Sequence, residues 1–235
     1  MLELLKNTLC NTYNKKQNLV VSFILVTVTV TMYLMQKMGF SITGIDYYFI
    51  ICFIMTLYYI YFIEEFAASE IEDKIVNIIY SYGYSRTQYI VVKIASSYLQ
   101  GAIHGLMIWV WYRLVVLRIW NQFDCQIGWQ CIIIYGFIAG ILASVDIICA
   151  LADKKRAMVV LMNVVMIIIC PFILEVIVAA VGVGSIKNIV ESSVFGLISK
   201  AGADLKLTLE SIVINLLTGI ILAIVVVRQN RKKNL

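Results

Sequence analysis

The sequence predicts an all-α membrane protein with six transmembrane helices. The first observation is composition: 62% of the 235 residues are hydrophobic, 14% are charged, and there is a single proline. A soluble domain has about 25% charged residues. The second observation is that the apolar residues come in runs of about 20, the length that a helix needs to cross a bilayer. With a mean hydropathy of +0.91, these runs leave no room for a soluble catalytic domain.

Six apolar runs are long enough to span a membrane. No internal repeat and no low-complexity linker divides them, so residues 19–235 are expected to form one transmembrane domain. No small-residue cleavage site follows the first run, which favours a retained span over a signal peptide. The predicted spans are residues 19–40, 46–66, 87–116, 129–152, 157–182 and 209–228.

The distribution of Lys and Arg predicts the orientation of these spans. With the N-terminus inside, 13 of the 19 basic residues fall on the inner side and 6 on the outer side. The contrast is sharpest at "DKKR" (153–156) and "RQNRKK" (228–233). Because basic residues favour the cytoplasmic side, both termini are predicted to be cytoplasmic. The net charge of +5 therefore reflects topology and does not indicate a nucleic-acid partner.

Two other segments are predicted to be helical without crossing the membrane. Residues 1–18 place apolar side chains on one stripe, which is typical of a helix lying in the membrane interface. Residues 184–206 have apolar residues at helical spacing, which predicts an external helix or helical hairpin before the sixth span.

A charged segment, "EIEDKIVNIIYSYGYSRTQYIVVK", separates the second and third spans. Ser69 and Glu72 fit a capping box that opens a short helix ending at Gly83. Ser85 and Gln88 fit a second capping box, at the start of the third span. The short helix is predicted over residues 70–83, and its apolar face consists of Ile71, Ile75, Ile78, Ile79 and Tyr82.

The acidic residues of this region separate two interpretations of the short helix. The helix either rests on lipid headgroups or docks on another protein. An anionic inner leaflet attracts Lys and Arg rather than carboxylates. The sequence therefore favours a cytoplasmic protein partner that offers an apolar cleft with a basic rim. The acidic residues are Glu64, Glu65, Glu70, Glu72 and Asp73.

The same segment resembles the ABC-2-type permeases, the membrane subunits of ABC exporters. In that family an acidic cluster, an apolar helix, a turn and a Ser-Arg pair precede the third span. Here they correspond to Glu70–Asp73, Ile75–Ile79, Gly83 and Ser85–Arg86, although Lys74 stands where the family often has Gly. The resemblance covers the layout of the whole chain but the motif only over about 25 residues.

The resemblance implies that residues 70–83 form a coupling helix. Such a helix sits in a groove of a separate cytoplasmic ATP-binding subunit, which carries the ATP and Mg. This chain itself has no G-x-x-x-x-G-K-[ST] loop. An external helical element between the fifth and sixth spans is also implied, at residues 184–206. The residues expected to couple to the ATP-binding subunit are Glu70, Glu72, Asp73, Ile75, Ile78, Ile79, Tyr82, Gly83 and Arg86.

The resemblance also implies an assembly and a substrate class. Six spans are half of the usual pathway, so a second copy or a related permease is expected in the plasma membrane of a bacterial cell. Small permeases with short external loops resemble those that export antimicrobial peptides, bacteriocins or peptide toxins, or that give immunity to them. An amphipathic peptide, or a hydrophobic drug, is the expected substrate.

Several polar and aromatic residues fall inside the predicted spans. His104, Asp146 and Glu175 either line a pathway or form hydrogen bonds between helices, because a lone charge at mid-span costs about 2.5–3.5 kcal/mol. Pro171 is predicted to kink the fifth span. The aromatic residues Tyr58, Tyr59 and Tyr61 lie on the second span, which lines the pathway in the family; core packing is the alternative.

Two further patterns concern packing. "GAIHG" (101–105) and "GFIAG" (136–140) are G-x-x-x-G patterns on successive spans, which predict close helix packing within the chain. Cys125 and Cys131 flank a short external loop and either form a disulfide or remain free thiols.

The sequence does not predict an enzyme. It has one His, and neither H-E-x-x-H nor G-x-S-x-G, the patterns of metal-dependent and serine hydrolases. Two alternatives to the exporter remain. One is a membrane binding or immunity protein that acts without ATP, and the other is a proton-coupled secondary transporter that uses Asp146 and Glu175. The 70–83 helix distinguishes them, because only the exporter needs a cytoplasmic protein to match its Ile face.

Overall fold

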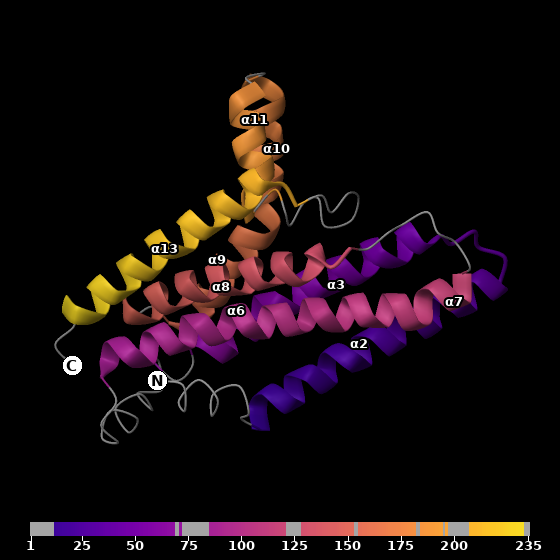
Figure 1. Ribbon diagram of the computed structural model, residues 1–235, viewed down its shortest axis with the longest axis horizontal. Helices are drawn as coiled ribbons and strands as arrows, with labels where there is room; N and C mark the ends of the chain where they lie inside the picture. The colour runs from indigo at the N-terminus through magenta and orange to yellow at the C-terminus, as the bar shows by residue number, and fades with distance from the viewer. Residues whose placement is uncertain are drawn as a thin grey trace.

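The computed structural model describes residues 12–68, 71, 85–120, 128–152, 155–181, 184–194, 196 and 207–232. Within these residues all regular structure is helical (Figure 1). The predicted all-α class with six spans is confirmed by helix length and composition. The stretches that are long and apolar enough to cross a membrane are Lys16–Lys37, Asp46–Ala67, Arg86–Val116, Gln130–Leu151, Arg156–Leu174 and Leu209–Arg231.

The first span belongs to helix α2 (Thr12–Lys37). The predicted interfacial helix over residues 1–18 differs from this arrangement, because residues 12–18 continue into the span without a break. Residues 12–18 contain no Gly or Pro that would end a helix, which is the physical reason for the continuity. Residues 1–11 lie outside the described residues.

The second span is α3 (Gly44–Ile63). Gly39, with φ of 98°, allows the chain to turn back after α2, since glycine adopts positive φ without steric cost. The start of α3 is capped by Thr43 and Asp46. The amide and hydroxyl of Thr43 donate to the Asp46 carboxylate at 2.9 and 2.7 Å, which satisfies donors that the helix start would leave open.

The centre of the molecule is the pair α6 (Arg86–Trp111) and α8 (Gln130–Leu151). The predicted capping box at the start of α6 is present: the Gln88 amide donates to the Ser85 hydroxyl at 3.2 Å, and the Ser85 amide donates to the Gln88 side chain at 3.1 Å. In α8, 78% of the most apolar stretch is buried, against 22% in the sixth span. The helix α8 is therefore the one that the others surround.

Glycines bring α6 and α8 into backbone contact. A Cβ atom on Gly105 would lie 2.6 Å from the carbonyl oxygen of Cys131, and one on Gly101 would lie 2.3 Å from that of Tyr135. No side chain fits at such separations, because they are below van der Waals contact. The two G-x-x-x-G patterns therefore mark a helix contact within this chain, as the sequence predicted.

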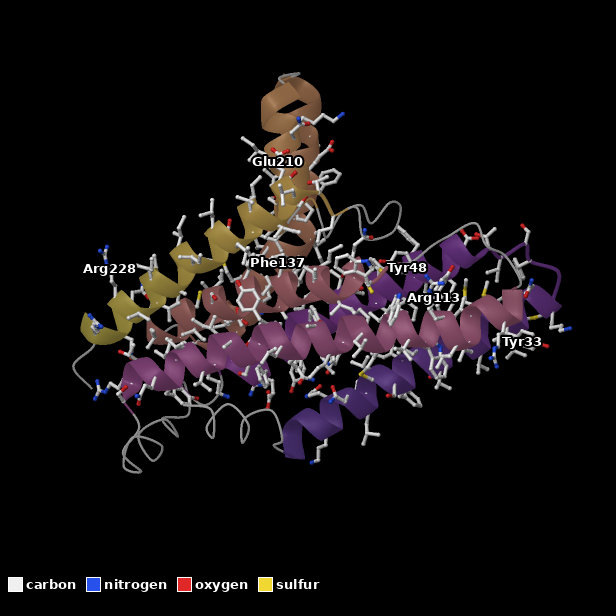
Figure 2. The ribbon with its side chains drawn as sticks, in the orientation of Figure 1. Tyr33, Tyr48, Arg113, Phe137, Glu210 and Arg228 are labelled. Atoms are coloured by element: carbon white, nitrogen blue, oxygen red, sulfur yellow. The ribbon has the colours of Figure 1, made fainter. Side chains whose placement is uncertain are left out.

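Tyr98 of α6 fills the space that two other glycines leave. Its ring lies where a Cβ atom of Gly140 in α8 would be, and its hydroxyl lies 2.2 Å from the corresponding position of Gly219 in the sixth span. The ring meets Phe137 edge to face, with the centroids 6.3 Å apart. Figure 2 shows Phe137 at this junction of helices. Tyr98 thus joins the central pair to the last span.

Among the described residues, three spans contain a turn of π-helix, in which backbone hydrogen bonds reach five residues back instead of four and which is often found at functional positions. These turns lie at a span end or beside a helix junction. They are η1 after α3, η2 after α6, and η3 between α9 (Arg156–Val164) and α10 (Cys170–Val181), covering Glu64–Ala68, Tyr112–Val116 and Val165–Ile169.

The turn η3 lies just before Pro171 in the fifth span. Proline has no N–H and cannot donate to the carbonyl one turn earlier. The Cys170 amide donates to the Val165 carbonyl, five residues back. Before this point α9 packs on α3 and α8; after it α10 packs on α11 (Gly184–Ser192). Figure 1 shows α10 and α11 projecting away from the direction of α2, α3, α6 and α8. The fifth span therefore changes partners at η3 and Pro171.

The sixth span is α13 (Leu209–Lys232), which packs on α8 and α6. Of the predicted external element over 184–206, the structure describes α11; residue 195 and residues 197–206 lie outside the described part. The Asn215 amide donates to the Ser192 carbonyl at 2.8 Å and to the Ser211 carbonyl at 2.7 Å. This side chain fixes the end of α11 to the start of α13.

The helices alternate in direction, so their ends gather at two sides. Helices α2 and α6 begin, and α3, α8 and α13 end, at the side drawn on the left in Figure 1, which we call the basal side. Arg228 extends outward from α13 at the basal side, whereas Tyr33 and Arg113 lie toward the opposite, apical side (Figure 2). The short helix α7 (Leu117–Trp120) is also apical.

The outer faces of several spans are apolar and exposed. Phe23 on α2, Phe172 on α10 and Ile221 on α13 are 60–70% exposed. Exposed apolar surface of this extent marks contact with a membrane or another protein. These faces fit a multi-pass membrane protein, in which lipid or another membrane helix covers them.

A matched pair of substitutions tests the α6–α8 contact. Gly105→Ala places a methyl group 2.6 Å from the Cys131 carbonyl oxygen, whereas Gly136→Ala meets nothing closer than 3.3 Å. We expect Gly105→Ala to destabilise the protein by about 1–3 kcal/mol, the usual effect of overpacking. Gly136→Ala should leave the thermal unfolding temperature in detergent nearly unchanged. Equal stability of the two variants would contradict the backbone contact.

Candidate functional site

Buried polar side chains converge on α3 from four other helices. A polar group in the apolar part of a membrane protein is costly unless the protein itself supplies a hydrogen-bond partner. We distinguish three groups of contacts by their residues. They are the His104 network (Asn18, Tyr59, Gln100, His104), the Asp146 network (Ile60, Asp146, Asn163) and the basal joint (Glu65, Phe66, Lys93, Arg156).

The His104 network joins α2, α3 and α6. His104 is fully buried; its Nδ1 lies 3.2 Å from the Tyr59 hydroxyl and its Nε2 lies 3.0 Å from the amide nitrogen of Gln100. The same amide nitrogen donates to the Asn18 side chain at 2.7 Å. Because an amide nitrogen only donates, His104 accepts at Nε2 and carries its proton on Nδ1, toward Tyr59. In the structure His104 thus forms hydrogen bonds between helices.

Aromatic rings enclose the imidazole. The ring centroids of Tyr58, Tyr59 and Phe62 lie 6.2, 5.8 and 5.1 Å from that of His104. Tyr58 also donates a hydrogen bond to Gln17 of α2. Tyr59 is fully buried, and its ring meets that of Tyr135 edge to face. Tyr58 and Tyr59 therefore belong to the packed interior around His104.

Tyr61 lies on a different side of α3. Its side chain is 56% exposed, so the three predicted aromatic residues do not line one common surface. Side chains four residues apart share a helix face, and three other large exposed residues precede Tyr61 at this spacing. We call this set the α3 apolar face, and it consists of Phe49, Phe53, Leu57 and Tyr61.

The Asp146 network joins α3, α8 and α9. Asp146 and Asn163 are both fully buried. The Asn163 amide donates to the Asp146 carboxylate at 2.9 Å and to the carbonyl of Ile60 at 3.2 Å. Hydrogen bonds of this kind reduce the cost of burying a carboxylate. His104 and Asp146 thus lie in separate networks, although both networks reach α3.

In the basal joint, Lys93 of α6 reaches the end of α3. Its ammonium donates to the carbonyl of Phe66, in the turn η1, at 3.1 Å. The ammonium also lies 5.1 Å from the ring centre of Phe66 and 5.9 Å from that of Tyr89. Only 4% of Lys93 is exposed. The carbonyls at a helix end carry partial negative charge, so a cation there is stabilising.

Arg156, the first residue of α9, holds the same turn from another side. Its guanidinium forms an ion pair with Glu65 and lies 5.9 Å from the ring centre of Tyr61. The charges of Lys93 and Arg156 therefore meet η1, the π-helical turn that follows α3, at neighbouring residues, Glu65 and Phe66. This turn directly precedes the segment that the sequence analysis assigned to coupling.

Most of the predicted coupling residues, Glu70, Glu72, Asp73, Ile75, Ile78, Ile79, Tyr82 and Gly83, lie outside the described residues. Arg86 is described and is the first residue of α6, behind the Ser85 cap. Ile71 is also described: it packs, half-buried, against the cluster of Ala150 from α8 and Val159 from α9. The segment between residues 68 and 85 thus leaves from α3 and enters α6.

The structure describes some, but not all, features of the remaining predicted site residues. Glu175 lies in α10, after the point where the fifth span leaves α3 and α8. Its side chain is not among the described ones. Cys131 is a free thiol that donates to the Gly105 carbonyl at 3.3 Å. This contact explains its burial between α6 and α8. Cys125 lies outside the described residues.

Three residues of the site are not evident from the sequence. Lys93 ends the charged segment quoted above, and its sequence context does not indicate that it is buried in α6. Gln100 and Asn163 are uncharged, and charge was the signal used to choose intramembrane residues. Gln100 lies one helical turn before His104, and such a spacing is a usable signal. Asn163 lies on the span after that of Asp146, and only the packing of α8 on α9 brings the two together.

A comparison of this chain with family models, with curated proteins and with solved structures finds no match. The site must therefore be judged on its own chemistry. Among the described residues, no three His, Cys, Asp or Glu side chains come together as a metal site. The three groups of contacts connect the C-terminal half of α3 to α2, α6, α8 and α9. This connection is mechanical.

Substitutions at Asn163 test the Asp146 network. Asn163→Leu removes the amide that serves two buried acceptors, so we expect a loss of about 1–3 kcal/mol in stability. In the double variant with Asp146→Leu both side chains become apolar, and the loss should be smaller, because no buried carboxylate remains to be served. Thermal unfolding in detergent, followed by size-exclusion chromatography, measures both. A double variant less stable than Asn163→Leu would contradict the network.

Proposed function

We propose that this chain is the membrane subunit of an ATP-driven exporter in the plasma membrane of a bacterial cell, with its basal side in the cytoplasm. The observation that carries the proposal is the basal joint. Where the chain leaves α3 for the 70–83 segment, Lys93 of α6 and Arg156 of α9 hold η1, the turn that follows α3. A force applied to that segment would act on several spans at once.

The force would be supplied by a separate cytoplasmic subunit that binds ATP and Mg. Ile71 packs on α8 and α9. The acidic residues and the rest of the Ile face, from Ile75 to Tyr82, suit a partner with a basic-rimmed apolar cleft, as the resemblance to ABC-2-type permeases implies. The segment joins η1 to the capped start of α6. Its displacement would pull on α3 through Glu65 and Phe66 and, through the Asp146 network, on α8 and α9.

The pathway would form between two copies of this chain, or between this chain and a related permease. The α3 apolar face is the surface that we assign to it, because this face is aromatic, exposed and continuous from Phe49 to Tyr61. Such a surface suits an amphipathic peptide, such as a toxin, bacteriocin or antimicrobial peptide, or a hydrophobic drug. Exposed aromatic side chains can cover the apolar part of the substrate and still tolerate its polar part.

Affinity purification tests this function. The tagged chain is expressed with the products of its genomic neighbours and purified in mild detergent. We expect a P-loop ATPase to co-purify at one copy per chain and to be lost in the double variant Ile75→Asp, Ile79→Asp, because two buried carboxylates are costly in an apolar cleft. Ile189→Asp on α11, where Ile189 is exposed, is the matched control and should retain the ATPase.

Each outcome of this purification separates the candidate functions. Purification of the chain without an ATPase, despite an intact 70–83 segment, would reject the exporter and favour a binding or immunity protein that acts without ATP. If the chain, reconstituted in vesicles, then moved protons across the membrane only while it transported substrate, a proton-coupled secondary transporter would be favoured. The buried carboxylate of Asp146, served by Asn163, is the observation on which that last candidate rests.

Tyr61 tests the assignment of the pathway. Because its side chain is 56% exposed, Tyr61→Ala should cost little stability, with about 0.5–1 kcal/mol from the contact with Arg156. We expect it to lower substrate-stimulated ATP hydrolysis several-fold while the ATPase still co-purifies. Tyr33→Ala, an exposed tyrosine of α2, is the control and should behave as the wild type. Unchanged stimulation in Tyr61→Ala would remove α3 from the pathway.

A further inference from the structure

Lys93 is an ionisable residue that the sequence places near a membrane surface and the structure places inside the protein. It is the eighth residue of α6, about 10 Å along the helix from Arg86, and it is 4% exposed. Ionisable residues inside membrane helices are rare because their burial is costly, and they usually have a function. The contacts of Lys93 indicate what that function is.

The backbone of Lys93 is fixed by neighbouring side chains. Ser96 and Ser97, both fully buried, donate their hydroxyls to the Lys93 carbonyl at 2.8 and 2.9 Å. Ser side chains inside a helix often bond in this way to a carbonyl three or four residues earlier. The side chain of Lys93 therefore extends from a buried turn of α6 whose carbonyl also accepts side-chain bonds.

The side chain ends at the last turn of the second span. The ammonium meets the Phe66 carbonyl and two aromatic ring faces, those of Phe66 and Tyr89. All three contacts favour a positive charge, since ring faces and helix-end carbonyls are both electron-rich. The turn η1 is a single π-helical turn, a rare form of helix. The bond from Lys93 to the Phe66 carbonyl attaches this turn to α6.

We propose that Lys93 is a positioning residue that bonds the end of α3 to α6, so that the segment between residues 68 and 85 is held on α6 at both ends. One end is the Phe66 carbonyl bound by Lys93, and the other is the Ser85 cap. A displacement of the segment is then transmitted to α6 instead of being lost in the turn η1. The bond itself does not depend on the proposed function; its role in transmission does.

Backbone hydrogen exchange tests the bond in the full-length chain in detergent. Lys93→Met keeps the length of the side chain but removes its charge. We expect the amides of residues 64–68 to exchange about tenfold faster in this variant, because η1 loses its bond to α6. Lys93→Arg should stay near the wild type. Lys16→Met, which replaces an exposed lysine at the start of α2, is the matched control and should not change residues 64–68.

The result that would overturn the proposal is equally direct. If Lys93→Met folds to a monodisperse protein and residues 64–68 exchange within about twofold of the wild type, Lys93 does not hold the turn. Should Lys93→Met fail to fold, Lys93→Gln, which keeps a donor without the charge, is measured by the same criteria.

The role in transmission is tested in the complex with the ATP-binding subunit. Lys93→Met should retain that subunit but transport about fivefold less substrate per ATP hydrolysed, since motion of the segment no longer reaches α6 efficiently. A wild-type ratio would overturn the role in transmission. If no ATP-binding subunit co-purifies even with the wild-type chain, the proposed function fails, and the exchange result still decides whether Lys93 holds the turn.

Discussion

The close contact between α6 and α8 is the constraint on which the rest of the structure depends. Gly101 and Gly105 have no side chains, so at these two positions α6 approaches the α8 backbone more closely than packed side chains would allow. This approach buries most of α8 and leaves the other spans to pack around it. Tyr98, which occupies the space at Gly140 and Gly219, carries the same arrangement to α13.

The second constraint is that buried polar groups must be satisfied within the protein. Asn18, Gln100, His104, Asp146 and Asn163 each take part in a hydrogen bond between helices, and Gln100 also bonds to His104 within α6. The bonds converge on α3, which therefore cannot move independently of its neighbours. This convergence ties the C-terminal half of α3 to α2, α6, α8 and α9, and Lys93 and Arg156 extend the same connection to η1.

The basal side is where the physical features of the molecule and the proposed function meet. Two cations, from Lys93 and Arg156, meet η1, the turn that follows α3, and Ile71 packs on α8 and α9 immediately beyond it. A segment attached in this way suits a protein that is moved from outside the membrane. Away from the basal side, α10 and α11 leave the central helices after Pro171 and project away from them.

The all-α class, the six spans, the Ser85 cap and the glycine contact can be predicted from the sequence, because each depends on local periodicity, run length or a short motif. Residues 12–18 continue into the first span as one helix, because an amphipathic stripe does not require a helix break, and the interfacial helix over residues 1–11 stays a prediction. The sequence does not indicate that Lys93 is buried, that Asn163 donates to both Asp146 and Ile60, or that Tyr61 but not Tyr59 faces outward. Those outcomes depend on which helices pack together and at what rotation, and residues far apart in the chain set both.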